Sequence, residues 1–450
     1  MRMRMPYTEM GNNTQTKLAL ISERARKEPR LQFTSLAHLL DEKFLKECYF
    51  KIGRDRASGI DGVSWEEYGK QLDENLKDLV SRMKVKQYKP QPSKRVYIPK
   101  DKNSKRPLGL PALEDKIVQK GVASILEAIY EQDFLGCSYG FRPNRNCHQA
   151  LKVVDNTIRW KPINYVIEAD IKGFFDNVSH EWMMRSLEVR IKDPSFLLLI
   201  KRFLKAGYID ADEFVQTTEG TPQGGNLSPV LANIFLHYVL DLWFVKKIVP
   251  TAKGFCSLAR YADDFICMVQ NATDAMFIEH AIRERFTKFN LELHPEKTRI
   301  IAIGRGPREK NERDNCCPRS FGFLGFTHYW GRSRKGNPLL CRKTNSKRFR
   351  RSCGEISTWL RNMRCSAKLK EWWPTLAAKL RGHYQYYGVS GNSRKIWQYY
   401  DAVTQIVFKW TNRRSQKVSF NWEQFRRYLK HYPLPRPRIV HKWYEPSTVS

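Results

Sequence analysis

The sequence predicts an α+β protein in which strands and helices alternate as far as residue 330 and helices alone follow. Two observations carry this prediction. The run NYVIEADI at 164–171 is apolar with a β-branched bias, as in a buried strand, and carries an acid, Asp170, near its end. After residue 331, apolar residues recur at helical spacing. A chain of 450 residues, 41% of them hydrophobic, can form two or three domains around a large core.

The charge of the chain points to a polyanionic partner. Lys and Arg total 79 against 46 Asp and Glu, a net charge of +33. Residues 331–450 hold 27 basic and 5 acidic residues, a net +22, together with seven of the twelve tryptophans. Such a field attracts nucleic acid over a long contact. We expect the tryptophans to form a helical core and the charges to face the partner.

Several classes of protein are excluded by composition. No run of about 18 apolar residues predicts a membrane span, and the basic, polar start MRMRMPYTEMGNN lacks the apolar stretch of a signal peptide. Ten cysteines without a paired CxxC spacing indicate reduced thiols rather than disulfides or zinc. We therefore expect a cytoplasmic protein, without a membrane partner.

The elements before the buried strand follow from local pattern. Residues 1–34 are polar and basic, which predicts a poorly ordered leader. A helical pattern begins at Ser35 and is broken by the loop at 51–63. The prolines of YKPQPSKRVYIPK at 88–100 favour an edge strand or an extended arm. A helix is predicted from Leu113 to Tyr130.

The elements after the strand include a long helix, a strand-like segment and a helical bundle. The long helix is predicted from Ser179, its N-cap, to Leu204, and SFGFLGFTHYW at 320–330 reads as strand. In the bundle, a first helix ends at Gly388, a second carries a face from Ile396 to Trp410, and Asn421 caps a third.

Three carboxylates stand out as a candidate metal site. Asp263 and Asp264 lie together in RYADDFICMV with apolar residues on both sides, and Asp170 ends the strand VIEAD. Adjacent acids at strand ends are costly unless a cation lies there. Carboxylates on neighbouring strands can hold two Mg²⁺ ions about 3.5–4 Å apart, which suits in-line attack on a phosphate. Asp176 is a poorer candidate ligand and is expected to cap a turn.

An ordered series of motifs resembles the reverse transcriptase–maturases encoded by group II introns. The series runs through RVYIPK, RPLGLP, YGFRPNRNCHQAL, EADIKGFFDNV, EGTPQGGNLSPVLANIFL, RYADDF, LHPEKT, FGFLGFTHY and LRGHYQYYGVSGN. The resemblance implies a right-hand polymerase, with fingers and an antiparallel palm sheet over 35–330. A helical thumb and maturase domain would follow over 331–440, and a tail over 441–450. It also implies an RNA-directed DNA polymerase with dNTPs, an RNA template and a DNA primer as partners.

The resemblance assigns roles to single residues. The three aspartates would hold two Mg²⁺ ions. Lys100 and Arg106 would reach the triphosphate of the nucleotide, and Phe175 would lie against the sugar 2′ position and exclude ribonucleotides. Gln223 and Gly224 would contact the nascent base pair, and Lys297 would protonate pyrophosphate. For intron RNA, the expected contacts from the basic C-terminal region are Arg394, Lys395, Lys409, Arg413, Arg414 and Lys417.

Three functions remain open from the sequence. The first is a polymerase that assists splicing of its intron and copies it into target DNA during retrohoming. The second is a maturase that only assists splicing, which the intact aspartate triad argues against. The third is an intron-derived enzyme domesticated for defence or DNA repair. About ten residues follow Val440, so we expect no C-terminal nuclease and priming from a replication primer or after reverse splicing into single-stranded DNA.

Overall fold

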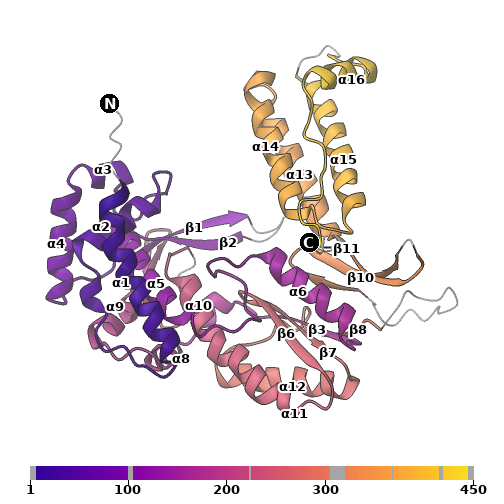
Figure 1. Cartoon of the computed structure of the whole chain (residues 1–450). Helices are drawn as coiled ribbons and strands as arrows, with labels where there is room; N and C mark the ends of the chain where they lie inside the picture. Colours follow the sequence, from indigo (N-terminus) through magenta and orange to yellow (C-terminus); the bar gives the residue numbers. More distant parts are fainter. Residues whose placement is uncertain are drawn as a thin grey trace.

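The computed structural model describes residues 7–99, 105–221, 224–304, 320–333, 335–366, 368–414 and 419–443. Figure 1 shows three bodies in chain order: an N-terminal lobe that carries β1 and β2, a central sheet flanked by helices, and a group of C-terminal helices that rises away from the sheet. We call these bodies the fingers, the palm and the thumb. The α+β prediction is confirmed.

The fingers are built mainly on helices from the first part of the chain. These helices are α1 (Tyr7–Lys27), α2 (Glu42–Ile52), α3 (Trp65–Gly69), α4 (Leu72–Lys84) and α5 (Leu113–Tyr130). The poorly ordered leader expected over 1–34 is wrong for α1, because Ile21 and Ala25 are buried and Ser22 donates a hydrogen bond to the Ala128 carbonyl of α5 (2.9 Å). The helix is mostly polar, and this narrow apolar contact holds it against α5.

The fingers also hold a small sheet in the order β2-β1-β4-β5. Its strands are β1 (Ser93–Pro99), β2 (Lys105–Leu110), β4 (Tyr208–Asp210) and β5 (Glu213–Val215). The prediction of an edge strand at 88–100 is wrong, since β1 pairs with β2 on one side and with β4 on the other. The second pairing covers only the start of β1, at Ser93 and Lys94, so the prolines at 90 and 92 lie outside the paired segment.

The palm sheet has the order β6-β7-β3-β8 and is antiparallel throughout. Its strands are β3 (Tyr165–Asp170), β6 (Cys256–Tyr261), β7 (Asp264–Val269) and β8 (Arg299–Ala302). Both faces are buried, because Val166 packs with helix α6 (Cys147–Trp160) and the next residue, Ile167, packs in the core that includes α12 (Ala272–Lys288). The strand predicted at 164–171 is therefore confirmed.

Further helices link the palm to the fingers. They are α7 (Phe174–Asn177), α8 (His180–Glu188), α9 (Pro194–Lys205) and α10 (Ser228–Leu236). The long helix predicted to end at Leu204 is two helices, because Asp193 caps α9 and Pro194 opens it. The predicted cap is confirmed, as Ser179 accepts from the Trp182 amide.

Helix α10 continues through two π-helical segments, η2 (His237–Asp241) and η3 (Phe244–Ile248), into α11 (Val249–Thr251). Among the residues that the structure describes, this helical run is the one long and apolar enough to cross a membrane. Its most apolar window is 72% buried inside the protein, as in the core helix of a folded domain.

A three-stranded sheet precedes the helices of the thumb. A sheet of β9 (Ser320–Phe323), β10 (Phe326–Arg332) and β11 (Pro338–Thr344) precedes α13 (Ser346–Met363), α14 (Leu369–Tyr387), α15 (Ser393–Thr411) and α16 (Trp422–His431). The predicted all-helical region from 331 therefore starts about fifteen residues too early. The expected aromatic core is confirmed, with Trp372, Trp373 and Trp410 buried, although Trp397 and Trp422 are 45% exposed.

Candidate active site

The Asp263–Asp264 pair lies at the turn of the β6–β7 hairpin. Tyr261 pairs with Asp264 across the hairpin, which leaves a two-residue turn of Ala262 and Asp263. Ala262 has φ +58°, a left-handed conformation that a residue with a Cβ seldom adopts. Such strain persists only where the surroundings enforce it, and it is often found at functional sites.

The palm register brings the third carboxylate to the same place. Asp170 at the end of β3 lies directly opposite Asp264 at the start of β7. Residues opposite each other on antiparallel strands point to one face, with Cβ atoms about 4.5–5.5 Å apart. The three acids predicted from two separate motifs are therefore neighbours.

The electrostatics of the site favour a bound cation. Loss of solvent, followed by the charges of Asp170, Asp263 and Glu168, raises the pKa of Asp264 to about 7. A divalent cation would relieve this repulsion, and carboxylate oxygens suit a hard ion such as Mg²⁺. Among the described residues, no group of three or more Asp, Glu, His or Cys side chains is arranged so that it could hold a metal ion. The Lys297 ammonium, a cation, is bonded to Asp170 (2.5 Å) instead.

Phe174 and Phe175 are neighbours in α7 and lie in different surroundings. Phe174 is buried against Phe235, with ring centroids 6.3 Å apart. Phe175, 9% exposed, lines a cavity of about 470 Å³ between the fingers sheet and the palm. The cavity wall also includes Arg95, whose guanidinium lies 3.5 Å from the ring centroid of Tyr208. Arg95 cannot be singled out from the sequence, because one arginine in a basic strand carries no distinctive signal.

The loop with Gly224 contacts both strand β2 and helix α5 of the fingers. A Cβ on Gly224, whose φ is +115°, would lie 2.4 Å from the Gly109 carbonyl oxygen of β2. The buried Gln119 of α5 accepts a hydrogen bond from the Asn226 amide (3.0 Å). Arg106 lies on β2, opposite Ile98 of β1. The other two residues predicted here, Lys100 and Gln223, lie outside the described residues.

The predicted RNA-binding residues fall at two places on α15. Arg394 and Lys395 lie in its first turn, at the end near the palm (Figure 1). Lys409 lies in its last turn, and Arg413 lies two residues past its far end. At 1.5 Å per residue, the two ends are roughly 27 Å apart. At the far end, Lys409 and Arg413 approach the face of Trp410 within 5.3 and 5.7 Å. Arg414 lies three residues past the end of α15, and Lys417 lies outside the described residues.

Comparison with known proteins agrees with this architecture. The family model of reverse transcriptase (RNA-dependent DNA polymerase) matches residues 98–328. Protein YkfC of Escherichia coli is 31% identical over 69% of this chain and 86% of its own length. The group II intron-encoded protein LtrA of Lactococcus lactis is 40% identical over 51% of this chain, and the match spans only 39% of LtrA. Nuclear intron maturase 4 of Arabidopsis thaliana is 29% identical over 30% of this chain and 16% of its own length. The chain thus belongs to the reverse transcriptases, the RNA-directed DNA polymerases, and among them to the reverse transcriptase–maturases of group II introns.

Proposed function

We propose that this RNA-directed DNA polymerase works with two Mg²⁺ ions held by Asp170, Asp263 and Asp264. Its natural template is the intron RNA, whose splicing it assists and whose retrohoming into target DNA it completes. The observation that carries the metal assignment is the pairing of Asp170 with Asp264 beside Asp263, with the pKa of Asp264 raised to about 7. The central test is the Asp264→Asn variant, which should lose DNA synthesis while it keeps its affinity for primer–template.

The residues of the chain would divide the work of nucleotide transfer. When bound, the ions lower the pKa of the attacking 3′-hydroxyl and stabilise the leaving pyrophosphate. Lys100 and Arg106 of the fingers neutralise the triphosphate, and Gly224 brings its loop close to the new base pair. Lys297, whose ammonium lies 2.5 Å from Asp170, would donate a proton to the departing pyrophosphate.

Phe175 is expected to select deoxyribonucleotides. Changing Phe175 to Val opens the cavity wall at the point where a 2′-hydroxyl would otherwise clash. We expect ribonucleotide incorporation, as the ratio of kcat/KM for a ribonucleotide to that for the matching deoxyribonucleotide, to rise about 10–100-fold. Single-nucleotide extension of a DNA primer on an RNA template measures this ratio.

Phe174→Val is the matched control, because it removes the same atoms from the neighbouring ring, which packs on Phe235. We expect it to lower the free energy of unfolding by about 2–4 kcal/mol through the cavity it leaves, without changing sugar selectivity. Equal selectivity of the Phe175 variant and the wild type would place the steric gate elsewhere.

The thumb is the proposed site of intron binding. It carries most of the excess charge, and the far end of α15 lies away from the palm (Figure 1). A charged surface there can hold structured RNA while a short primer–template occupies the palm. Release of ions from RNA on binding makes log K fall with log salt, by about 0.7 for each phosphate neutralised on a single strand.

Reversing charge at the far end of α15 should therefore weaken intron binding selectively. For the double variant Lys409→Glu and Arg413→Glu, we expect the slope of log K against log salt to flatten by about 1.4. Splicing assistance should fall with it, and extension on a short unstructured template should change less than about twofold. Filter binding of intron RNA at several salt concentrations measures the slope.

The control is Lys77→Glu with Lys84→Glu, two exposed lysines of α4 that give the same change of net charge in the fingers. This variant should leave the slope for intron RNA within error of the wild type. If both double variants flatten the slope equally, binding follows net charge and the thumb has no special part. If extension collapses while the slope holds, the thumb serves only the primer–template.

A further inference from the structure

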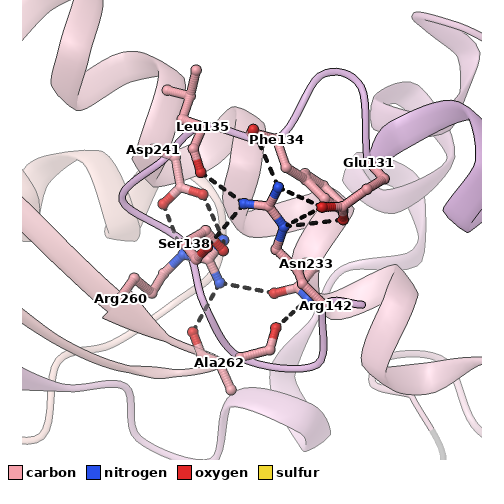
Figure 2. Close-up of polar contacts among 10 residues, drawn as sticks. Glu131, Phe134, Leu135, Ser138, Arg142, Asn233, Asp241, Arg260 and Ala262 are labelled. Carbon is pink, nitrogen blue, oxygen red and sulfur yellow. Dashed lines mark hydrogen bonds and ion pairs between the residues drawn. The ribbon is translucent and has the colours of Figure 1, made fainter. Parts of the chain in front are cut away.

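Arg260 is a fully buried cation in β6, just before the catalytic turn. Its guanidinium uses all five N–H groups (Figure 2). Two bind the Asp241 carboxylate, at 2.7 and 2.5 Å. The others bind the Asn233 side chain (3.0 Å), the Ser138 hydroxyl (2.7 Å) and the Ala262 carbonyl (3.0 Å). Every donor of a side chain that is 0% exposed is therefore satisfied.

The side-chain partners of Arg260 come from two segments that meet behind the turn, namely the continuous helical run of α10 and η2 and the loop before α6. Asp241 closes the π-helical segment η2, Asn233 lies in α10, and Ser138 lies in the loop before α6. This loop runs alongside β6 and is hydrogen-bonded to it, since the Arg260 amide donates to the Cys137 carbonyl (2.8 Å). The network thus joins the hairpin to the helix and loop beside it.

The turn is held from a second side by Gly140. Asn233 donates to the Gly140 carbonyl (2.7 Å), and a Cβ on Gly140 would lie 2.3 Å from the Ala262 amide nitrogen. The loop can therefore touch the turn only because residue 140 has no side chain. Ala262 is enclosed between this loop and the Arg260 guanidinium, which accounts for its left-handed backbone.

A buried ion pair of this kind is poorly explained by stability alone. Removing two charges from water is costly, and apolar side chains of similar size often give an equally stable core. A guanidinium does what an apolar side chain cannot, which is to fix several acceptors in one plane. One of them, the Ala262 carbonyl, belongs to the peptide that joins Ala262 to Asp263. The orientation of that peptide sets the direction in which the carboxylates leave the turn.

We infer that Arg260, held by Asp241 and Asn233, is a positioning residue for Asp263 and Asp264. It touches neither nucleotide nor metal, and it acts by fixing the peptide of the turn. The inference rests on the proposed role of the aspartates as metal ligands. A shift of the order of 1 Å in a reacting group can cost about 100-fold in rate, so loss of this constraint should reduce the chemical step.

The test compares Arg260→Lys with the wild type in primer extension. Lysine keeps the positive charge beside Asp241 but has no planar fork to hold Asn233 and the Ala262 carbonyl together. Active sites are first counted from the burst of product on a tight primer–template. We expect kcat per active site to fall about 10–100-fold and the Mg²⁺ concentration for half-maximal rate to rise several-fold. The Kd for primer–template should stay within about twofold, since basic residues elsewhere set it.

Arg190→Lys is the matched control. Arg190 is a buried arginine of the fingers that binds Asp133 (2.6 Å) and the carbonyls of Pro29 and Leu31 (2.8 and 3.0 Å). It makes a similar network with no bond to the hairpin. We expect this variant to reduce the number of active sites or the thermal midpoint, while kcat per active site and the Mg²⁺ requirement stay at the wild-type values.

A milder variant covers the case in which Arg260→Lys does not fold. Ser138→Ala removes one acceptor from Arg260 and should lower kcat per active site several-fold. The inference is overturned if the Arg260 and Ser138 variants lose only active sites and keep wild-type kcat and Mg²⁺ dependence per site. Asp264→Asn run beside them separates the two proposals. If it is active, the metal assignment fails, and if it is inactive while Arg260→Lys is normal, the positioning role alone fails.

Discussion

Changing Asp264 to Asn should reduce DNA synthesis at least about 1,000-fold while leaving the Kd for primer–template within twofold. The amide keeps the size of the side chain but removes the charge that would bind a metal ion, and ions in such sites supply much of the stabilisation of a phosphoryl-transfer transition state. Affinity for nucleic acid depends mainly on basic residues remote from the turn. Extension of a DNA primer on an RNA template with Mg²⁺ measures the rate, and filter binding measures the Kd.

Glu168→Gln provides the control, because Glu168 lies on the same face of β3 two residues before Asp170. Its carboxylate is committed to the Gly322 amide and to Arg299 (2.6 Å). We therefore expect less than about a fivefold change. Normal extension by Asp264→Asn would refute the metal assignment and would leave the splicing-only maturase as the better proposal. Equal loss in both variants would add Glu168 to the ligand set.

The three candidate metal-binding aspartates could be recognised in the sequence because their signal is local. Asp170 and Asp264 each stand at the end of a run of apolar residues, and a buried strand that ends in an acid needs a reason for the acid. The helix caps at Ser179 and Asn421 were predicted for the same reason, since a cap depends on the residues within one turn. Both kinds of feature can be predicted because they depend on neighbouring residues and not on distant ones.

The features that sequence reasoning missed depend on distant pairings. Strand β1 was expected at an edge, and it became internal because β4, more than a hundred residues later, pairs with its start. The hydrogen-bond network of Arg260 cannot be predicted from the sequence, because its partners, from Ser138 to Asp241, are scattered along the chain. The early boundary of the thumb has a related cause. Strand β11 lies in the same basic region as the helices that follow it, and its sequence does not distinguish it from them.

The second large effect on nucleotide incorporation is expected from a substitution at Gly224. Changing Gly224 to Ala should lower kcat/KM for the incoming nucleotide about 100-fold, chiefly by raising KM. The substitution meets two obstacles: a φ of +115°, which costs about 1–3 kcal/mol for a residue with a Cβ, and a contact of 2.4 Å with the Gly109 carbonyl oxygen. Since both sides of that contact are backbone, the loop or strand β2 has to move. A displacement of the order of 1 Å is enough to disturb a bound nucleotide.

Gly53→Ala separates backbone strain from the collision. Gly53 also has a positive φ, +80°, but a Cβ there would meet nothing within 4 Å. This variant should lose stability by about 1–3 kcal/mol and keep a wild-type KM for the nucleotide. Steady-state extension at varied dNTP, with thermal unfolding of each protein, gives both quantities. If Gly224→Ala also keeps its KM and loses only stability, the loop is a structural support of the fingers and the base-pair contact proposed for it is wrong. If KM rises in the Gly224 variant alone, the close approach of the loop to β2 is what shapes the nucleotide site.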